Sequence, residues 1–160
     1  MKKLENLDYG VIGNCKSAAL VSRWGSIDWC CLPDFDSSSV FARILDERRG
    51  GTFAIEPVGE CEIEQFYLEK TNILVTRFSG ADGAFEVCDF MPRYKTDTGL
   101  YHCPPDIIRY FRHISGAMQV KFHYEPRPAY AQYPTRTECT DEFIKTMTTT
   151  GPYESIYAYT

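Results

Sequence analysis

Three carboxylates lie close together in the first quarter of the sequence and could do acid–base chemistry: Asp28, Asp34 and Asp36. Asp34 and Asp36 are two positions apart, so in an extended segment they point to the same side. Paired carboxylates are the machinery of glycoside hydrolysis, in which one protonates the leaving oxygen and the other activates water or attacks the sugar. A structural role is favoured over catalysis, because an aspartate before serines, such as Asp36, commonly bonds local backbone amides in turns and caps.

An aromatic side chain near these carboxylates could contact a sugar. Trp24 lies at the tip of a predicted turn, beside Arg23 and Gly25. The apolar face of an exposed indole ring can stack on the apolar face of a sugar ring, and core filling is the competing role. The turn position makes Trp24 a candidate for contact with a sugar or with a partner domain.

Histidines and cysteines form no recognisable metal-binding pattern. His113 and His123 fall on strands that could pair, but no third ligand stands out. The sequence has seven cysteines and no Cys-x-x-Cys pair, so the spacing does not match a zinc site. We therefore expect no metal and no cofactor, and we interpret the cysteines as buried, reduced thiols of a cytoplasmic protein.

Composition excludes several classes of function. The formal net charge is −5, with acidic and basic residues mixed along the chain, so the clustered positive charge of a nucleic-acid-binding protein is missing. The basic start is followed by no apolar stretch, which argues against a secretion signal. No apolar run approaches the roughly 20 residues needed to span a bilayer. We expect neither nucleic-acid nor membrane partners.

Strands are the elements that must position these residues. Apolar and polar side chains alternate from Met118 to Glu125, which places the apolar ones on one face of a strand. The turn residues between strand-like segments are typical of hairpins. Three hairpins are predicted, joining 18–22 to 26–31, 72–78 to 84–90, and 106–114 to 118–124. Two further strands are predicted at 51–56 and 60–68, a loop at 94–105, and strand material again in the tail from 146.

Helical spacing is confined to one segment, Ser37–Asp46, where Val40, Phe41, Ile44 and Leu45 fall on one helical face. Many strands at hairpin spacing with one short helix favour an antiparallel sandwich over βαβ units. The predicted fold is therefore all-β, a two-layer antiparallel sandwich with one short helix. Residues 1–160 form one domain in this interpretation, and we expect it to be truncated at its C-terminal end, because the strand-like tail continues past the last residue.

Three groups of segments resemble the amino-terminal domain of glycoside hydrolase family 15, as found in bacterial glucoamylase-like and trehalase-like proteins. The first group has the most specific motifs, Gly25–Trp29 and Phe35–Ser37. The second centres on Asp89–Pro92 and the third on Val120–Phe122. Together the groups follow the family's order along nearly the whole chain.

The resemblance implies a supersandwich-like β-domain packed against an (α/α)6 barrel that holds two catalytic glutamates and hydrolyses α-glucosidic bonds with inversion. Those glutamates would lie after Thr160, so no catalytic residue is assigned here. The partner is the barrel of the same polypeptide, with α-glucan or trehalose at the domain interface, and the alternative is a stand-alone carbohydrate-binding module for starch-like glucans. The predicted substrate or inter-domain contacts are Arg23, Trp24, Asp28, Asp34, Phe35 and Asp36.

Overall fold

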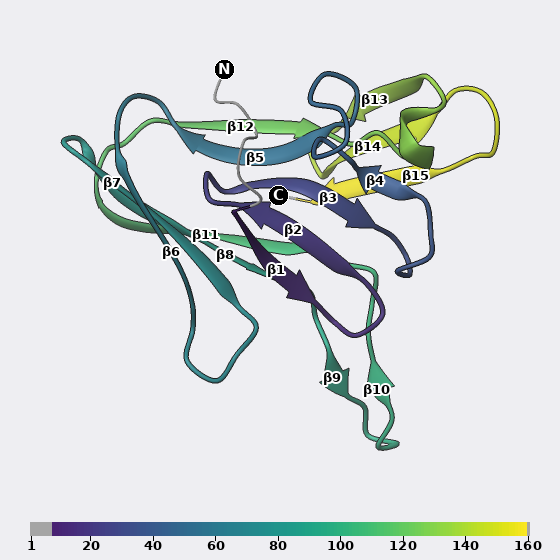
Figure 1. Cartoon of the computed structure of the whole chain (residues 1–160), viewed down its shortest axis with the longest axis horizontal. Coiled ribbons are helices and arrows are strands. Elements are labelled where there is room, and N and C mark those ends of the chain that lie inside the picture. Colours follow the sequence, from purple (N-terminus) through teal and green to yellow (C-terminus); the bar gives the residue numbers. More distant parts are fainter. Residues whose placement is uncertain (1–7, 160) are drawn as a thin grey trace.

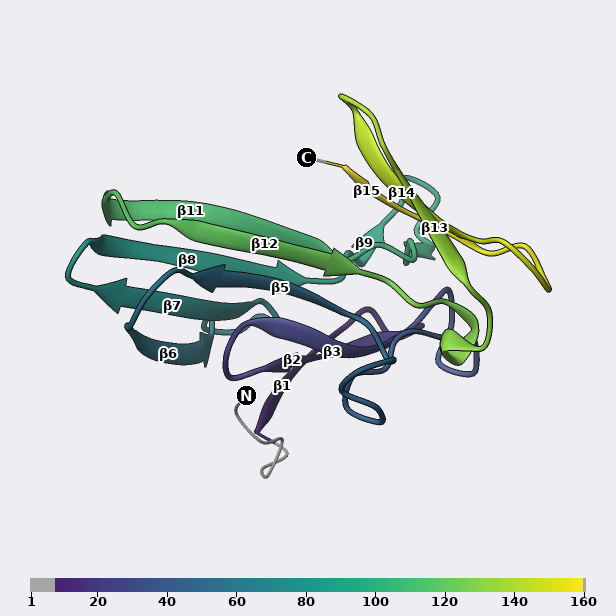
Figure 2. The same ribbon diagram turned by 90° about the horizontal axis from the view of Figure 1, so that it is seen from above.

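Two antiparallel sheets face one another and form a sandwich (Figures 1 and 2). The computed structural model describes residues 8–159. The first sheet has the order β1-β2-β3-β5-β12, with β4 added to β3. Its strands are β1 (Tyr9–Gly13), β2 (Ala18–Ser22), β3 (Ser26–Cys31), β4 (Ser39–Phe41), β5 (Thr52–Pro57) and β12 (Val120–Glu125). The second sheet has the order β11-β8-β7-β6, formed by β6 (Glu62–Tyr67), β7 (Leu74–Gly80), β8 (Gly83–Phe90) and β11 (Ile108–Gly116).

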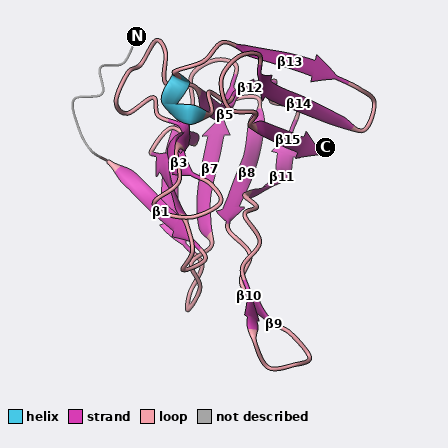
Figure 3. Ribbon diagram, turned by 90° about the vertical axis from the view of Figure 1, so that its right-hand side faces the viewer, coloured by secondary structure: helices cyan, strands magenta, loops and turns pink. Residues whose placement is uncertain are grey.

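The remaining elements lie outside the two layers. The predicted loop at 94–105 contains a small hairpin, β9 (Tyr94–Lys95) and β10 (Tyr101–His102), which projects away from the sheets (Figure 3). A third sheet, β13-β14-β15, comprises Thr135–Cys139, Phe143–Thr148 and Ser155–Tyr159. Ile156 of this sheet packs on the sandwich core. A 3-10 turn, η1 (Ala129–Ala131), precedes it.

The sequence prediction of an all-β antiparallel sandwich is confirmed, and so are two of the three hairpins. β2 and β3 are joined through Arg23, Trp24 and Gly25, and Gly25 has a φ of 79° that a side chain would strain. β7 and β8 pair directly up to Gly80 and Gly83, the two ends of a tight turn. These two hairpins could be predicted because the residues of each turn favour a hairpin by themselves.

The third predicted hairpin is wrong, because β11 and β12 belong to different sheets. β11 pairs with β8, whereas β12 pairs with β5. The three residues between the two strands cross from one sheet to the other. The Ala117 amide donates to Asp82 O at 2.8 Å, and Gln119 O accepts from the Val58 amide at 2.9 Å. His113 and His123, expected on paired strands, therefore lie on separate sheets.

The predicted helix at Ser37–Asp46 is also wrong. Val40 and Phe41 lie in β4, where Phe41 pairs with Cys30, and both are buried. A short apolar run that is buried on both faces cannot be told from a helix by periodicity alone. Beyond it the chain makes only turns, and Leu45, expected on the apolar face, is 70% exposed. The short helical element of the fold is η1 instead.

A buried arginine, paired with an aspartate of its own sheet, links the two sheets. The Arg109 side chain on β11 is 2% exposed, and its Nε lies 2.8 Å from Oδ1 of Asp89 on β8, which is 0% exposed. The same guanidinium donates to the backbone carbonyls of Phe53 in β5 and of Gly25 in the β2–β3 turn, both in the opposite layer. Its carbon also lies 4.7 Å from the centre of the Phe53 ring. The charge of this buried arginine is thus balanced by the Asp89 carboxylate. Its hydrogen bonds to the two carbonyls tie the second sheet to the first.

A second charged cluster crosses the outer face of the second sheet and makes stability depend on pH. Glu86 is buried and bonds Arg77 and Arg112, its neighbours on β7 and β11. Burial alone raises the pKa of Glu86, but the hydrogen bonds from Arg112 and Arg77 outweigh it and lower the pKa below 4.5. A lowered folded-state pKa gives stability that is present above the unfolded value and is lost as pH falls.

We therefore expect the protein to lose more free energy of unfolding than its Glu86→Gln variant when pH falls from about 6 to about 3. Urea denaturation of both proteins at the two pH values measures the difference. Equal losses in the two proteins would show that the two arginines do not hold the carboxylate in its ionised form.

Candidate functional site at the loop end of the sandwich

The predicted contact residues are separated by β3. Arg23 and Trp24 lie before the strand, at the tip of the β2–β3 hairpin, while Asp34 and Asp36 follow its other end. A strand rises about 3.3 Å per residue, so the six residues of β3 place the two groups about 20 Å apart. The structure therefore does not bring all six residues into one site.

Several loops meet at the end of the sandwich where β3 finishes, and we call this the loop end. It comprises residues 32–38, 42–51, 126–134 and 149–154, on the right of Figure 1. Ser38 Oγ lies 3.3 Å from a carboxylate oxygen of Glu154, and the Tyr130 hydroxyl donates to Ser37 O at 3.4 Å. Segments far apart in the sequence are thus joined here by side-chain contacts.

The loop end exposes aromatic side chains beside carboxylates. Phe35 is 62% exposed, Tyr130 47% and Tyr153 66%. Asp36 is exposed next to Phe35, and Asp34 is held by Lys16 at 3.8 Å. Large exposed apolar groups with a polar surround are characteristic of contact surfaces.

The turn that carries Tyr130 is strained. Ala129, Tyr130 and Ala131 have φ values of 55°, 55° and 56°, in the left-handed region that costs residues other than glycine about 1–2 kcal/mol each. The turn is fixed at its base, where Arg127 bonds Glu125 and its amide donates to Val40 O at 2.8 Å. Strain of this kind concentrates at functional sites. The sequence analysis did not identify Tyr130 as a contact residue. The local signal for a turn there was the pair of prolines, Pro126 and Pro128.

Asp28 is a structural carboxylate at a β-bulge. Val21 pairs with Ile27 and Leu20 with Trp29, so Asp28 is the extra residue, and a bulge redirects its side chain. The side chain is buried, accepting from the Tyr9 hydroxyl at 3.1 Å. Burial, with the Asp28 charge and hydrogen bond, raises the pKa of Tyr9.

Two further groups complete the surroundings of Asp28. Its second oxygen lies 2.8 Å from the Thr52 hydroxyl and 3.9 Å from the Arg43 guanidinium. The Asp28 carbonyl also accepts from the Ile44 amide at 3.2 Å. Asp28 therefore attaches the segment after β4 to the middle of β3. Because that segment is part of the loop end, Asp28 helps to hold the loop end in place.

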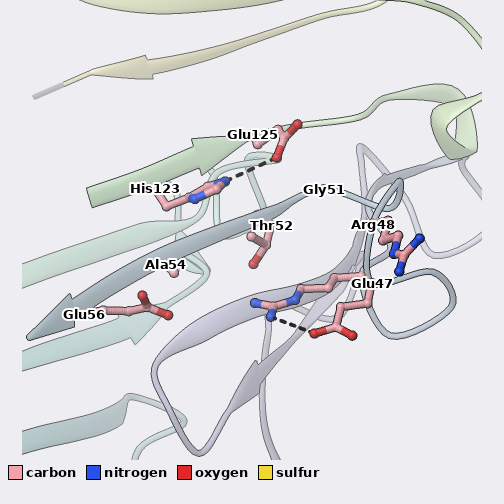
Figure 4. Close-up of a pocket in the computed structure, with 9 residues that line it drawn as sticks. Glu47, Arg48, Gly51, Thr52, Ala54, Glu56, His123 and Glu125 are labelled. Carbon is pink, nitrogen blue, oxygen red and sulfur yellow. Dashed lines mark hydrogen bonds and ion pairs between the residues drawn. The ribbon is translucent and has the colours of Figure 1, made fainter. Parts of the chain in front are cut away.

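A polar groove of about 330 Å3 lies next to the loop end, over β5 and β12. Figure 4 shows His123 and Glu125 coming from β12, with Glu47 and Arg48 coming from the loop after β4. Arg43 bonds Glu47 at 3.5 Å, and His123 lies 3.2 Å from Glu125.

The carboxylate of Glu125 is not suited to general acid catalysis. Burial alone raises its pKa, but the hydrogen bonds from Arg127 and His123 outweigh burial and lower the pKa. A general acid in glycoside hydrolysis needs the opposite shift, because it must hold its proton near neutral pH. The groove offers hydrogen-bonding groups for a polar partner.

The hairpin tip is a separate surface at the other end of β3. Arg23 lies 3.9 Å from Asp8 and Trp24 is 41% exposed. The tip packs on the ring of Phe78 in the core. Gly25 lies so close to this ring that a Cβ at position 25 would be 2.9 Å from a ring carbon of Phe78.

Comparisons with known proteins identify the family. The family model described as "Trehalase-like, N-terminal" matches residues 3–157. The chain is similar to "Trehalase" of Thermoplasma volcanium, 36% identical over 127 residues, covering 78% of this chain and 20% of that protein. It is also similar to "Trehalase 2" of Sulfolobus acidocaldarius, 36% identical over 124 residues, covering 78% and 19%. No solved structure matches.

A bacterial relative is also named as a trehalase. "Trehalase" of Mycolicibacterium smegmatis is 33% identical over 132 residues, covering 74% of this chain and 20% of that protein. The chain thus spans about one-fifth of the length of the curated relatives it matches. No helix among residues 8–159 is long and apolar enough to cross a membrane. The chain belongs to the trehalase-like N-terminal domain family, and the three relatives described above are named trehalases.

Proposed function

We propose that this chain is a non-catalytic N-terminal domain of an inverting trehalase-like or glucoamylase-like glycoside hydrolase, and that it packs on the catalytic barrel of the same polypeptide. The observation that carries the proposal is that an N-terminal family model matches almost the whole chain, while the chain aligns with only about one-fifth of its relatives' length. The side chains support it, because Asp28 is used for structure and the pKa of Glu125 is lowered. Catalytic carboxyl groups are then supplied by the barrel.

The loop end is the surface that we assign to the barrel. It gathers Phe35, Asp36 and the strained Tyr130 turn on one side of the sandwich. Exposed aromatic side chains on rigid, strained loops lose little conformational freedom when they are buried against a partner. At the rim of an active site they would help to shape its mouth, where α-glucan or trehalose enters. Arg23 and Trp24, at the other end of β3, are a second and separate candidate contact.

The assignment predicts a loss of activity in the parent enzyme when the loop end is altered. Replacing Phe35 and Tyr130 together by serine is expected to lower kcat/KM for its α-glucoside about tenfold, because small displacements at a domain contact misplace groups at the active site. Steady-state kinetics on the purified enzyme measures the change. The matched control is Tyr101→Ser, a residue that is 60% exposed on the projecting hairpin. If the control lowers kcat/KM as much as the double variant, the loop end has no special role.

Sugar binding by the domain itself is the second candidate, and one observation favours it. On the outer face of the β14–β15 pair, Tyr157 and Tyr159 have nearly parallel rings, 13° apart with centres 6.2 Å apart, and both are exposed. The Lys145 ammonium lies over the Tyr157 and Tyr153 rings. Aromatic faces beside hydrogen-bonding groups are what a starch-like glucan would contact. Calorimetric titration with maltooligosaccharides, repeated on Tyr157→Ala, separates this module from a domain that only packs on the barrel.

We also propose the cytoplasm as the compartment. Of the seven cysteines only Cys30 and Cys31 are buried, and Cys15 and Cys139 are exposed, so the expectation that the cysteines are buried is wrong for most of them. Cys30 and Cys31 are adjacent and free, and free thiols persist where the environment is reducing. Fractionation of cells that express the tagged parent protein tests this location.

A further inference from the structure

We propose that the polar groove over β5 and β12 binds a small, neutral, hydroxyl-rich ligand of the size of a mono- or disaccharide. Its volume of about 330 Å3 lies at the small end of the range for ligand sites in proteins, roughly 300–1,000 Å3. The inference goes beyond the proposed function, which assigns no ligand to this groove. It rests on the charges and hydrogen-bonding groups that line the groove.

The floor of the groove is made of small residues. Gly51, Thr52 and Ala54 form it, and all three are buried. Gly51 cannot be replaced by a larger residue, because a Cβ there would collide with the Glu125 carbonyl oxygen of β12. Thr52 and Ala54 are two positions apart on β5, so they face the same side of the sheet. The hollow is thus built into a paired strand, and a ligand meets it already formed.

Ion pairs on the two walls hold hydrogen-bonding groups in place. On one wall Arg43 lies 3.5 Å from Glu47, and on the other His123 lies 3.2 Å from Glu125, as Figure 4 shows. These four side chains are between 29% and 44% exposed. A guanidinium has more N–H donors, and a carboxylate more acceptor sites, than one ion pair uses. Each pair therefore has hydrogen-bonding capacity left for a ligand.

Two further charges in the groove have no ion-pair partner. Neither the Arg48 guanidinium nor the Glu56 carboxylate forms an ion pair with any residue in the range 8–159. Figure 4 shows the two residues at opposite ends of the groove, Arg48 in the loop after β4 and Glu56 in β5. A donor and an acceptor are therefore available at the two ends to a ligand that lies along the floor.

The balance of charge selects a neutral ligand. Two arginines and three glutamates line the groove, and Lys121, opposite Glu56 in the strand register, balances their charges. A small anion would meet the glutamates and a small cation the arginines, while an apolar ligand would leave charged groups without water or a partner. A hydroxyl group both donates and accepts. A sugar can therefore bond guanidinium and carboxylate groups at the same time.

NMR titration of the 160-residue chain with trehalose and with lactose tests the site. The amide signals of Gly51, Thr52 and Ala54 are expected to shift and to saturate with a Kd of about 1–10 mM. The affinity is low because the groove is lined by no Phe, Tyr or Trp ring on which a sugar could stack. Sulfate and spermidine, as charged probes, are expected to bind more weakly. The proposal is overturned if neither sugar shifts these signals, or if either charged probe binds more tightly than both sugars.

A double substitution identifies the groups that hold the sugar. Arg48→Ala with Glu56→Ala is expected to raise the Kd at least about tenfold, because it removes a charged donor and a charged acceptor. The matched control, Glu69→Ala with Lys70→Ala, removes two exposed opposite charges and should leave the Kd unchanged. Tyr157→Ala should also leave it unchanged, which separates the groove from the aromatic face of β14–β15. Equal Kd values in the double variant and its control would contradict the assignment.

Hydrogen–deuterium exchange of the longer parent polypeptide gives a readout that does not depend on the 160-residue chain folding by itself. Lactose is the probe, since it contains no α-glucosidic bond that the enzyme could cleave. At about ten times the Kd it is expected to slow exchange at the amides of residues 51–54 severalfold, and to have no effect in the Arg48→Ala, Glu56→Ala variant. Amides that are protected without lactose and unchanged by it would show that another part of the polypeptide fills the groove, and the proposal would be wrong.

Discussion

Replacing Arg109 by alanine is expected to lower the free energy of unfolding by about 3–5 kcal/mol, because it leaves a buried carboxylate without its partner. Asp89 is 0% exposed and is held by Arg109 through two hydrogen bonds of 2.8 and 3.1 Å. The variant also removes the donor to the backbone carbonyls of Phe53 in β5 and of Gly25 in the β2–β3 turn. Urea denaturation followed by intrinsic fluorescence measures the loss.

Two controls separate the buried charge from lost packing. Arg136→Ala removes an exposed ion pair with Glu138 and is expected to change stability by less than about 1 kcal/mol. The double variant Arg109→Met with Asp89→Leu removes both charges, and it is expected to recover much of the loss, since apolar pairs often replace buried ion pairs at little cost. If Arg109→Ala is as stable as Arg136→Ala, the Arg109 side chain does not hold the sheets together.

Asp28→Ala is expected to lower the free energy of unfolding by about 2–3 kcal/mol, because it leaves buried polar groups unsatisfied. The substitution removes the acceptor of the Tyr9 hydroxyl and the carboxylate beside Thr52 and Arg43. It also releases the segment after β4 that borders the loop end. Thermal and urea denaturation give the size of the loss.

The nearby aspartate Asp36 is the matched control for Asp28. Asp36 is exposed in the loop end, so Asp36→Ala is expected to change stability by no more than about 0.5 kcal/mol. Asp28→Ala with unchanged stability would contradict the structural role, and it would reopen a chemical role for this carboxylate in the parent enzyme.

Local signals in the sequence were sufficient to predict several of the strands and two of the hairpins. Alternation along 118–125 and the glycine-containing turns after Ser22 and Gly80 predicted strands and hairpins that the structure confirms. These features are readable because side-chain alternation and positive φ at glycine are decided by neighbours in the chain. The motifs Gly25–Trp29 and Phe35–Ser37 led to the family that the comparisons establish.

Pairing between distant strands could not be predicted in the same way. The short link after Gly116 fits a hairpin, and only the competing edges of β8 and β5 decide that β11 and β12 separate. The bulge at Asp28 is likewise set by the register of β2 against β3. The Tyr130 turn depends on the contacts of Arg127, which joins η1 to β12 and to Val40.

The most direct test of the account is the hydrolysis of trehalose and maltooligosaccharides by the purified 160-residue chain, beside the longer parent polypeptide. We predict glucose release by the longer protein and none by the 160-residue chain at equal molar concentration. Turnover by the 160-residue chain that disappears in Glu125→Gln would show that the polar groove is itself an active site, and would contradict a domain whose carboxylates serve structure and contact.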